Sequence, residues 1–186
     1  FAPQIRALLD GTGPAPDGLP LDPDLRWALW TALAATGHAD APDLAAELGR
    51  DDTASGRTAH LRALTARPLP EVKGEAWRAA LEDPGLSNDQ LDAVIGGFRA
   101  GERRDLIAPY DDAYFAAIRG VWATRSIEIA RRIVLGLFPA ADSLDAVDAW
   151  LTSNADAPGA LRRLVIEQRD HLARDLRVRA LGVNDV

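Results

Sequence analysis

The sequence contains no cysteine and no methionine among its 186 residues. Without cysteine, the chain cannot form disulfide bonds, thiolate-ligated zinc sites, iron–sulfur clusters or thiol nucleophiles. Because it begins at Phe1 and carries no initiator residue, we expect it to be a piece of a longer protein.

Positive charge and long apolar runs are also scarce. Acidic residues outnumber basic residues by 28 to 21, which gives a net charge of −7 and disfavours sequence-independent binding to nucleic acid or anionic lipid. No run approaches the roughly 18 apolar residues of a membrane-spanning helix, and the N-terminus lacks the order of a signal peptide. We therefore expect a cytoplasmic domain with no nucleic-acid partner and no membrane partner.

Runs of β-branched residues bounded by turns are missing too, whereas apolar residues recur at helical spacing through nearly the whole chain. This pattern predicts an all-α fold. In the first half, Ser87 and Gln90 have the spacing of a capping box. The adjacent Gly96 and Gly97 indicate either a neighbour that packs closely there or a bend in the helix, and we favour close packing. The predicted helices cover about 4–9, Pro23 to Gly37, Asp40 to Leu48, Thr53 or Ser55 to Pro68, 71–82 and Asn88 to Gly101.

The second half is predicted to begin with a short helical turn at Leu106 and Ile107. The next helix is predicted to begin at Pro109 and to break at Gly120, and Thr124 is predicted to cap a central helix over 125–138. Ser143 is predicted to cap the helix after that, and the last helix runs from Asp156 and Pro158 to about Leu181.

Helix pairs at 22–48, 53–82 and 87–119 begin roughly 30 residues apart, which favours a short, irregular HEAT-like solenoid of antiparallel hairpins. A globular helical bundle is the alternative. We expect residues 1–20 to hold part of a preceding helix and a Gly/Pro-rich loop, and residues 21–186 to form a single helical-repeat domain.

Catalytic signatures are absent. The sequence has no His-Glu-x-x-His motif for zinc and no Gly-x-Ser-x-Gly elbow for a serine hydrolase. Glu167 and His171 have the spacing of half a metal site, but an exposed side-chain pair is the simpler interpretation. The three arginine doublets, which begin at 103, 131 and 162, are interpreted as salt-bridged helix surfaces, and most of the five tryptophans as core anchors.

The stretch 121–130 is the most suggestive, because Arg125 and Glu128 place charge on a segment that is otherwise apolar nearly all round. One interpretation is a solvent-facing stripe. The other is a charged strip that faces an internal cavity and meets peptide or ligand ends, since the arginine fork suits carboxylates.

Four segments together resemble the C-terminal helical domain of actinobacterial aminopeptidase N, and the resemblance runs over roughly residues 19–181. These segments are Asp24 to Gly37, Asp52 to Gly56, Val94 to Phe98, and Trp122 to Pro139. In that family, the resemblance implies, a β-domain and a thermolysin-like domain with the zinc motif come first, and a HEAT-like or armadillo-like C-terminal domain covers the active site. The resemblance also implies that the C-terminal domain forms a chamber that admits peptides.

None of the family's catalytic positions maps onto this chain, because the zinc ligands, the general base and the transition-state tyrosine belong to the preceding domain. The resemblance thus implies a non-catalytic domain whose partners are the catalytic domain of the same polypeptide and peptide substrates, with zinc only in the parent enzyme. Arg125 and Glu128 are the peptide-chamber candidates. A helical-repeat scaffold for protein interaction is the alternative function, and a ligand-binding regulator would need a basic DNA-reading helix, which the sequence lacks.

Overall fold

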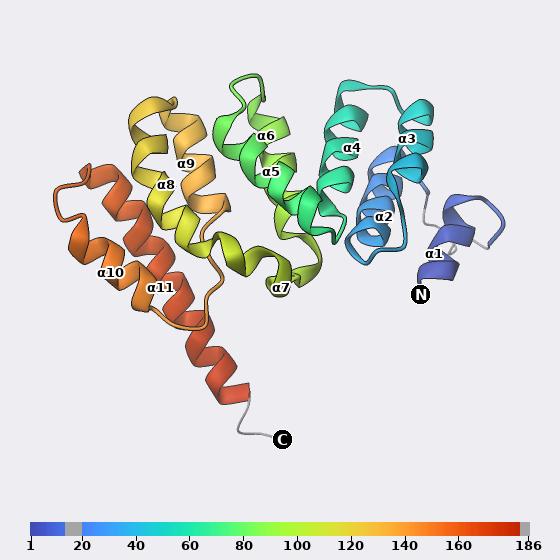
Figure 1. Cartoon of the computed structure of the whole chain (residues 1–186). Helices are drawn as coiled ribbons and strands as arrows, with labels where there is room; N and C mark the ends of the chain where they lie inside the picture. Colours follow the sequence, from blue (N-terminus) through green and yellow to red (C-terminus); the bar gives the residue numbers. More distant parts are fainter. Residues whose placement is uncertain (14–19, 183–186) are drawn as a thin grey trace. The chain divides into compact units, whose positions relative to one another are not determined.

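The computed structural model describes residues 1–13 and 20–182, and within these residues it contains helices and turns but no strand. The prediction of an all-α fold is confirmed. The α-helices and 3₁₀-helices are α1 (Ala2–Leu9), α2 (Pro23–Ala35), α3 (Ala41–Arg50), α4 (Ala54–Ala66), α5 (Pro70–Glu82), α6 (Asn88–Arg99), η1 (Ala100–Glu102), α7 (Arg104–Ile107), η2 (Ala108–Tyr110), α8 (Asp111–Thr124), α9 (Ile127–Gly136), α10 (Asp145–Ser153) and α11 (Gly159–Gly182) (Figure 1).

The chain divides into two compact units, Phe1–Leu106 and Ile107–Val186. The HEAT-like solenoid and the single domain over 21–186 remain predictions. Residues 14–19 of the Gly/Pro-rich loop lie outside the described residues.

Helix starts in the first unit follow their capping residues. The Asp22 carboxylate accepts a hydrogen bond from the Leu25 N–H at 2.8 Å and caps α2, which begins at the predicted Pro23. Thr53, the first of the two residues considered for α4, is its N-cap. Ser87 and Gln90 form the predicted capping box, in which each side chain accepts a hydrogen bond from the other residue's N–H. Such caps satisfy N–H groups that have no partner within the helix.

Helix α4 occupies the middle of the first unit, where it packs against α2 and against α6 (Figure 1). Trp27 and Trp30 on α2 are buried, as is Leu44 on α3. Close approach to α6 depends on Gly97: a Cβ there would lie 1.9 Å from Thr65 Oγ1 and 2.5 Å from the Arg62 carbonyl oxygen. The prediction that a neighbour packs closely at the glycine pair is confirmed.

Two charged groups are buried in this unit. Glu47 accepts hydrogen bonds from Arg26 Nε at 2.6 Å and from Trp30 Nε1 at 3.0 Å. Burial alone would raise the Glu47 pKa, but these donors outweigh it and lower the pKa. Lys73 on α5 is fully buried, and its ammonium donates to three backbone carbonyls.

The second unit packs α8 against α9, and α11 against α9 and α10. The buried Tyr114 donates from its hydroxyl to the Val134 carbonyl at 2.7 Å, which ties α8 to α9. Arg169 on α11 reaches Asp148 on α10 through two of its guanidinium nitrogens, at 2.5 and 3.1 Å.

Several boundaries in this unit differ from the prediction. Helix α8 continues through Gly120 and ends at Thr124, whose hydroxyl donates back to the Gly120 carbonyl at 2.8 Å. A cap needs a non-helical backbone, so Ser126, not Thr124, caps α9 and accepts from the Ile129 N–H. The predicted central helix is shorter than 125–138, and it is not buried on all sides, because Ile127 is 64% exposed.

The remaining starts are close to their predicted places. Ser143 Oγ accepts from the Asp145 N–H at 3.3 Å, although Leu144 takes the formal N-cap position of α10. Helix α11 begins one residue after Pro158. In the described part of the chain, no helix combines the length and the apolar character needed to cross a bilayer.

Candidate ligand-binding groove

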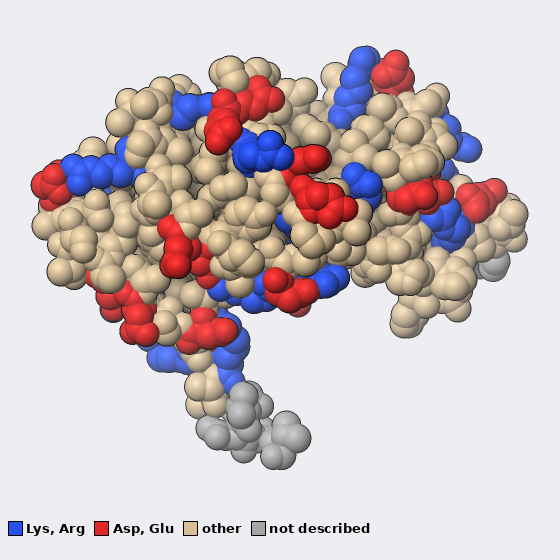
Figure 2. Space-filling model, in the orientation of Figure 1, with Lys and Arg blue, Asp and Glu red and all other residues tan. Residues whose placement is uncertain are grey.

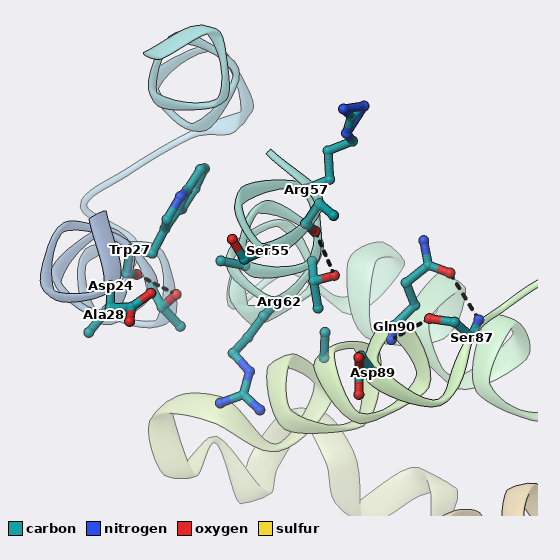
Figure 3. A pocket seen from close by; sticks show the side chains of 14 residues that line it. Asp24, Trp27, Ala28, Ser55, Arg57, Arg62, Ser87, Asp89 and Gln90 are labelled. Carbon is teal, nitrogen blue, oxygen red and sulfur yellow. Dashed lines mark hydrogen bonds between the residues drawn. The ribbon is translucent and has the colours of Figure 1, made fainter. Parts of the chain in front are cut away.

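A groove with a volume of about 1000 Å³ lies along α2, α4 and α6, entirely within the first unit (Figure 3). Each helix contributes a stripe of residues spaced three or four apart, the spacing that keeps side chains on one helical face. The lining residues are Asp24, Trp27, Ala28, Thr31, Ala54, Ser55, Arg57, Thr58, Ala59, Arg62, Ser87, Asp89, Gln90 and Ala93.

The three helices run in the same direction along the groove. Trp27 lies near the start of α4, where its Nε1 donates to Asp51 at 2.9 Å, and Gly97 near the end of α6 meets Thr65 near the end of α4. Asp24, Ser55 and Asp89 each stand two residues after an N-cap. These three residues therefore lie at the same end of the groove.

The charges of the groove are separated along its length. Asp24 and Asp89 belong to the end formed by the helix starts, whereas Arg62 follows Ser55 by seven residues on α4. Seven helical residues span about 10 Å. The groove therefore has acidic groups at one end and a guanidinium about two turns away.

The two arginines of the groove differ in their surroundings. Arg57 forms an ion pair with Asp52, 3.3 Å between Nε and Oδ1, and donates to the Asp52 carbonyl. Among residues 1–13 and 20–182, no carboxylate lies within 4.0 Å of the Arg62 guanidinium. That guanidinium lies against Gly96 of α6, where a Cβ would be 2.9 Å from its Nη2 and 3.0 Å from its Cζ. Arg62 is thus a cation available to a ligand.

Aromatic side chains support the wall of the groove. Trp27 packs edge-on against His60, with ring centroids 6.0 Å apart. Hydrogen bonds from Thr53 and Trp27 lower the pKa of the Asp51 carboxyl, and burial lowers the pKa of His60, which favours the neutral imidazole. His60 Nε2 is buried and has no hydrogen-bond partner among the described residues.

Two hydroxyl groups of the groove are already paired within their own helices. Thr31 and Thr58 donate their hydroxyls to carbonyls of their own helices, to Trp27 and to Ala54. In the part of the chain that the structure describes, no three His, Asp or Glu side chains gather where they could hold a metal ion. What the groove offers a ligand is the Arg62 fork, two carboxylates and a partly apolar floor.

The two sequence-predicted chamber residues lie in the second unit. Arg125 is half-buried and follows the last residue of α8. Glu128 is 56% exposed in the first turn of α9 and pairs with Arg132 at 3.0 Å. The structure places them three residues apart around the Ser126 cap and leaves their role in a chamber as a prediction.

Two of the three arginine doublets contain an ion-paired arginine, as predicted, whereas Arg162 of the third binds backbone carbonyls. Arg103 pairs with Asp105 at 2.6 Å, Arg132 with Glu128, and Arg162 donates to the Leu151 and Asn154 carbonyls. His171 is exposed and lies 3.5 Å from Gln168. Acidic and basic side chains are interspersed on the face shown in Figure 2. Four of the five tryptophans are buried as core anchors, namely Trp27, Trp30, Trp77 and Trp150.

Sequence reasoning missed Arg62. The available signal was the stripe Ser55, Thr58, Ala59 and Arg62, which places small and polar residues on one face of α4. Such a stripe is typical of any exposed helix face. Only the neighbouring helices α2 and α6 show that this one lines a groove.

Comparison with known proteins gives the chain a family. Residues 2–174 match the model of the ERAP1-like C-terminal domain. The chain is also 46% identical over 180 residues to an aminopeptidase N from Streptomyces lividans, and this match covers 95% of the chain and 21% of that relative. The chain therefore spans about a fifth of the length of the curated relative it matches. With nearly its whole length matched, the chain belongs to the ERAP1-like C-terminal domain family.

Proposed function

We propose that this chain is the non-catalytic C-terminal domain of a longer zinc-dependent aminopeptidase that removes N-terminal residues from peptides. The single observation that carries the proposal is the 46% identity to an aminopeptidase N over nearly the whole chain. In this role the domain covers the active site of the catalytic domain, forms a peptide chamber with it and limits which peptides enter.

In this proposal the zinc belongs to another part of the longer polypeptide, because the chain matches only 21% of the length of its aminopeptidase relative. When bound there, the metal would supply Lewis-acid polarisation of the scissile carbonyl and would lower the pKa of a bound water. The residues of this chain bind and orient the peptide, which changes the apparent affinity for substrate more than the chemical step.

Arg125 and Glu128 are proposed to face the chamber. Replacing each by alanine in the longer enzyme should raise KM for peptides of several residues at least threefold and leave KM for a single-residue p-nitroanilide reporter unchanged. The physical reason is that a long peptide reaches these side chains and a single residue does not. Steady-state kinetics on a peptide series measures the effect.

Arg131→Ala is the matched control, because Arg131 is exposed on the same helix. Equal changes in KM for the long peptides and the reporter would contradict the assignment of Arg125 and Glu128. The isolated 186-residue chain, mixed with zinc and the reporter, should release no p-nitroaniline; turnover that survives repurification would overturn the proposed function.

A further inference from the structure

We propose that the groove along α2, α4 and α6 binds a short extended peptide whose carboxylate docks on the Arg62 guanidinium. That the ligand is a peptide rests on the proposed function. The position of the site and its preference for a carboxylate rest on the geometry of the groove.

The first step of the argument is the contrast between two arginines in one groove. Arg57 is neutralised by Asp52 at 3.3 Å, whereas Arg62 has no carboxylate within 4.0 Å among the described residues. A guanidinium presents a rigid fork that matches a carboxylate in a bidentate pair. Arg62 is therefore the group of the groove that an anionic ligand would contact.

The second step is the support that α6 gives to this side chain. Without a Cβ at Gly96, the Arg62 guanidinium lies directly against the backbone of α6. A guanidinium that lies beside a helix on one side has fewer positions open to it than one that is solvated all round, so it loses less conformational freedom on binding. Gly96 thus contributes to the site although it has no polar side chain.

The third step is the spacing of charges. Asp24 and Asp89 lie at the same end of the groove as Ser55, and the backbones of Ser55 and Arg62 are offset by about two helical turns, roughly 10 Å along α4. Three extended residues cover about the same distance. A peptide of three or four residues can therefore place a carboxylate on Arg62 and a cationic group near the two aspartates.

The carboxylate has two possible sources, the C-terminus of a peptide or an acidic side chain. Both supply the same fork-matching group, and peptides with blocked ends separate them. The probes are Lys-Ala-Ala-Ala with a free C-terminus, the same peptide with a C-terminal amide, and Lys-Ala-Ala-Glu with a C-terminal amide.

The experiment titrates these peptides into the 186-residue chain and measures binding by calorimetry and by amide chemical-shift changes. We expect saturable binding of at least one carboxylate-bearing peptide, and a loss of at least tenfold in affinity for Arg62→Gln. Arg78→Gln, at an exposed position on α5 that does not line the groove, should change affinity less than twofold. Gly96→Ala, which displaces the guanidinium, should weaken binding without unfolding α6.

The outcomes decide the question. Binding of the free acid alone identifies a C-terminal carboxylate, and binding of the amidated glutamate peptide as well identifies either source as sufficient. No saturable binding to the wild-type chain, equal losses in both arginine variants, or undiminished binding of the peptide without any carboxylate would each overturn the inference. If the groove binds none of these peptides but removal of the chain from the longer enzyme alters peptide selection, the inference fails and the proposed function stands. If the groove binds them but removal of the chain leaves peptide selection unchanged, the proposed function fails and the binding site stands.

Discussion

Lys73 is the single lysine of a chain with 21 basic residues, and its side chain is 0% exposed. Its Nζ donates to the carbonyl oxygens of Thr65 at 2.9 Å, Ala66 at 3.1 Å and Gly97 at 2.8 Å. The first two belong to the last turn of α4, where carbonyls have no partner within the helix. One ammonium thus satisfies the end of α4 and connects it to α6.

The geometry explains why lysine stands here. An ammonium is compact and has three donors, which match three converging carbonyls, whereas a guanidinium is planar and larger. The Leu64 carbonyl of the same turn accepts from Arg67 Nε at 3.0 Å, at a part-buried place that is open enough for a guanidinium. At position 73 the space is fully enclosed.

Replacing Lys73 by methionine should lower the free energy of unfolding by about 1–3 kcal/mol, because buried carbonyls lose their donor. Lys73→Arg should also destabilise the chain, since the larger head group overpacks the site. Urea denaturation followed by circular dichroism measures both effects. Arg78→Met, an exposed position on the same helix, should change stability by less than 0.5 kcal/mol in magnitude, roughly the range of surface substitutions. A Lys73→Met variant as stable as Arg78→Met would contradict this role.

The charge of Lys73 also predicts a pH dependence. Burial, together with the nearby positive charge of Arg103, lowers the Lys73 pKa to about 8, whereas an unfolded lysine titrates near 10.4. Between these values unfolding takes up a proton, so the free energy of unfolding of the wild-type chain should rise with pH relative to Lys73→Met. Below pH 8 the difference between the two should be constant. The lowered pKa would be contradicted if the free energy of unfolding of the wild-type chain, minus that of Lys73→Met, fell as the pH rises from 8 to 10.

At the scale of helices, α6 contains two adjacent glycines that differ in how well the surrounding structure would tolerate a Cβ atom. Gly97 meets the fixed backbone and the Thr65 hydroxyl of α4, whereas Gly96 meets only the far end of the flexible Arg62 side chain. The pair allows close packing at one position and supports the groove at the other.

The two positions should therefore respond differently to alanine. Gly97→Ala should destabilise the chain by roughly 1–3 kcal/mol through overpacking. Gly96→Ala should be neutral or stabilising by up to about 1 kcal/mol, because alanine is the better helix former and the arginine head can move. Denaturant midpoints of the two variants provide the comparison, and equal destabilisation would show that the two glycines are equivalent.

Helix boundaries were predictable where the determining contacts are local. Asp22, Thr53 and Ser87 each cap the helix that follows, and the hydrogen bond runs to a residue three positions on. The boundary between α8 and α9 was predicted wrongly because Thr124 and Ser126 are both capping residue types two positions apart. The backbone at each residue decides between them, and that backbone is set by packing within the second unit.

For the whole molecule, the candidate site could not be predicted from the sequence because it joins three distant segments. Asp24, Arg62 and Asp89 come from helices that meet only through the packing of α4 between α2 and α6. Within the described residues Arg62 has no salt-bridge partner, which is likewise a property of the fold and not of the local sequence. The family resemblance, in contrast, extends along nearly the whole chain and is confirmed by the match over residues 2–174.

The proposed function gives the chain a role in selecting peptides. The residues proposed for this role come from both units: Arg62 lies in the first, and Arg125 and Glu128 lie in the second. The proposed function requires that both act on substrates longer than one residue.

The central claim is tested most directly by measuring kcat/KM across peptides of one to ten residues for the longer enzyme, with and without the segment equivalent to residues 1–186. The account predicts that removal changes the length dependence at least fivefold, while the single-residue reporter is still cleaved and zinc remains bound. Restoring the segment as a separate chain should return part of the original profile. A change by the same factor at every peptide length would contradict the account.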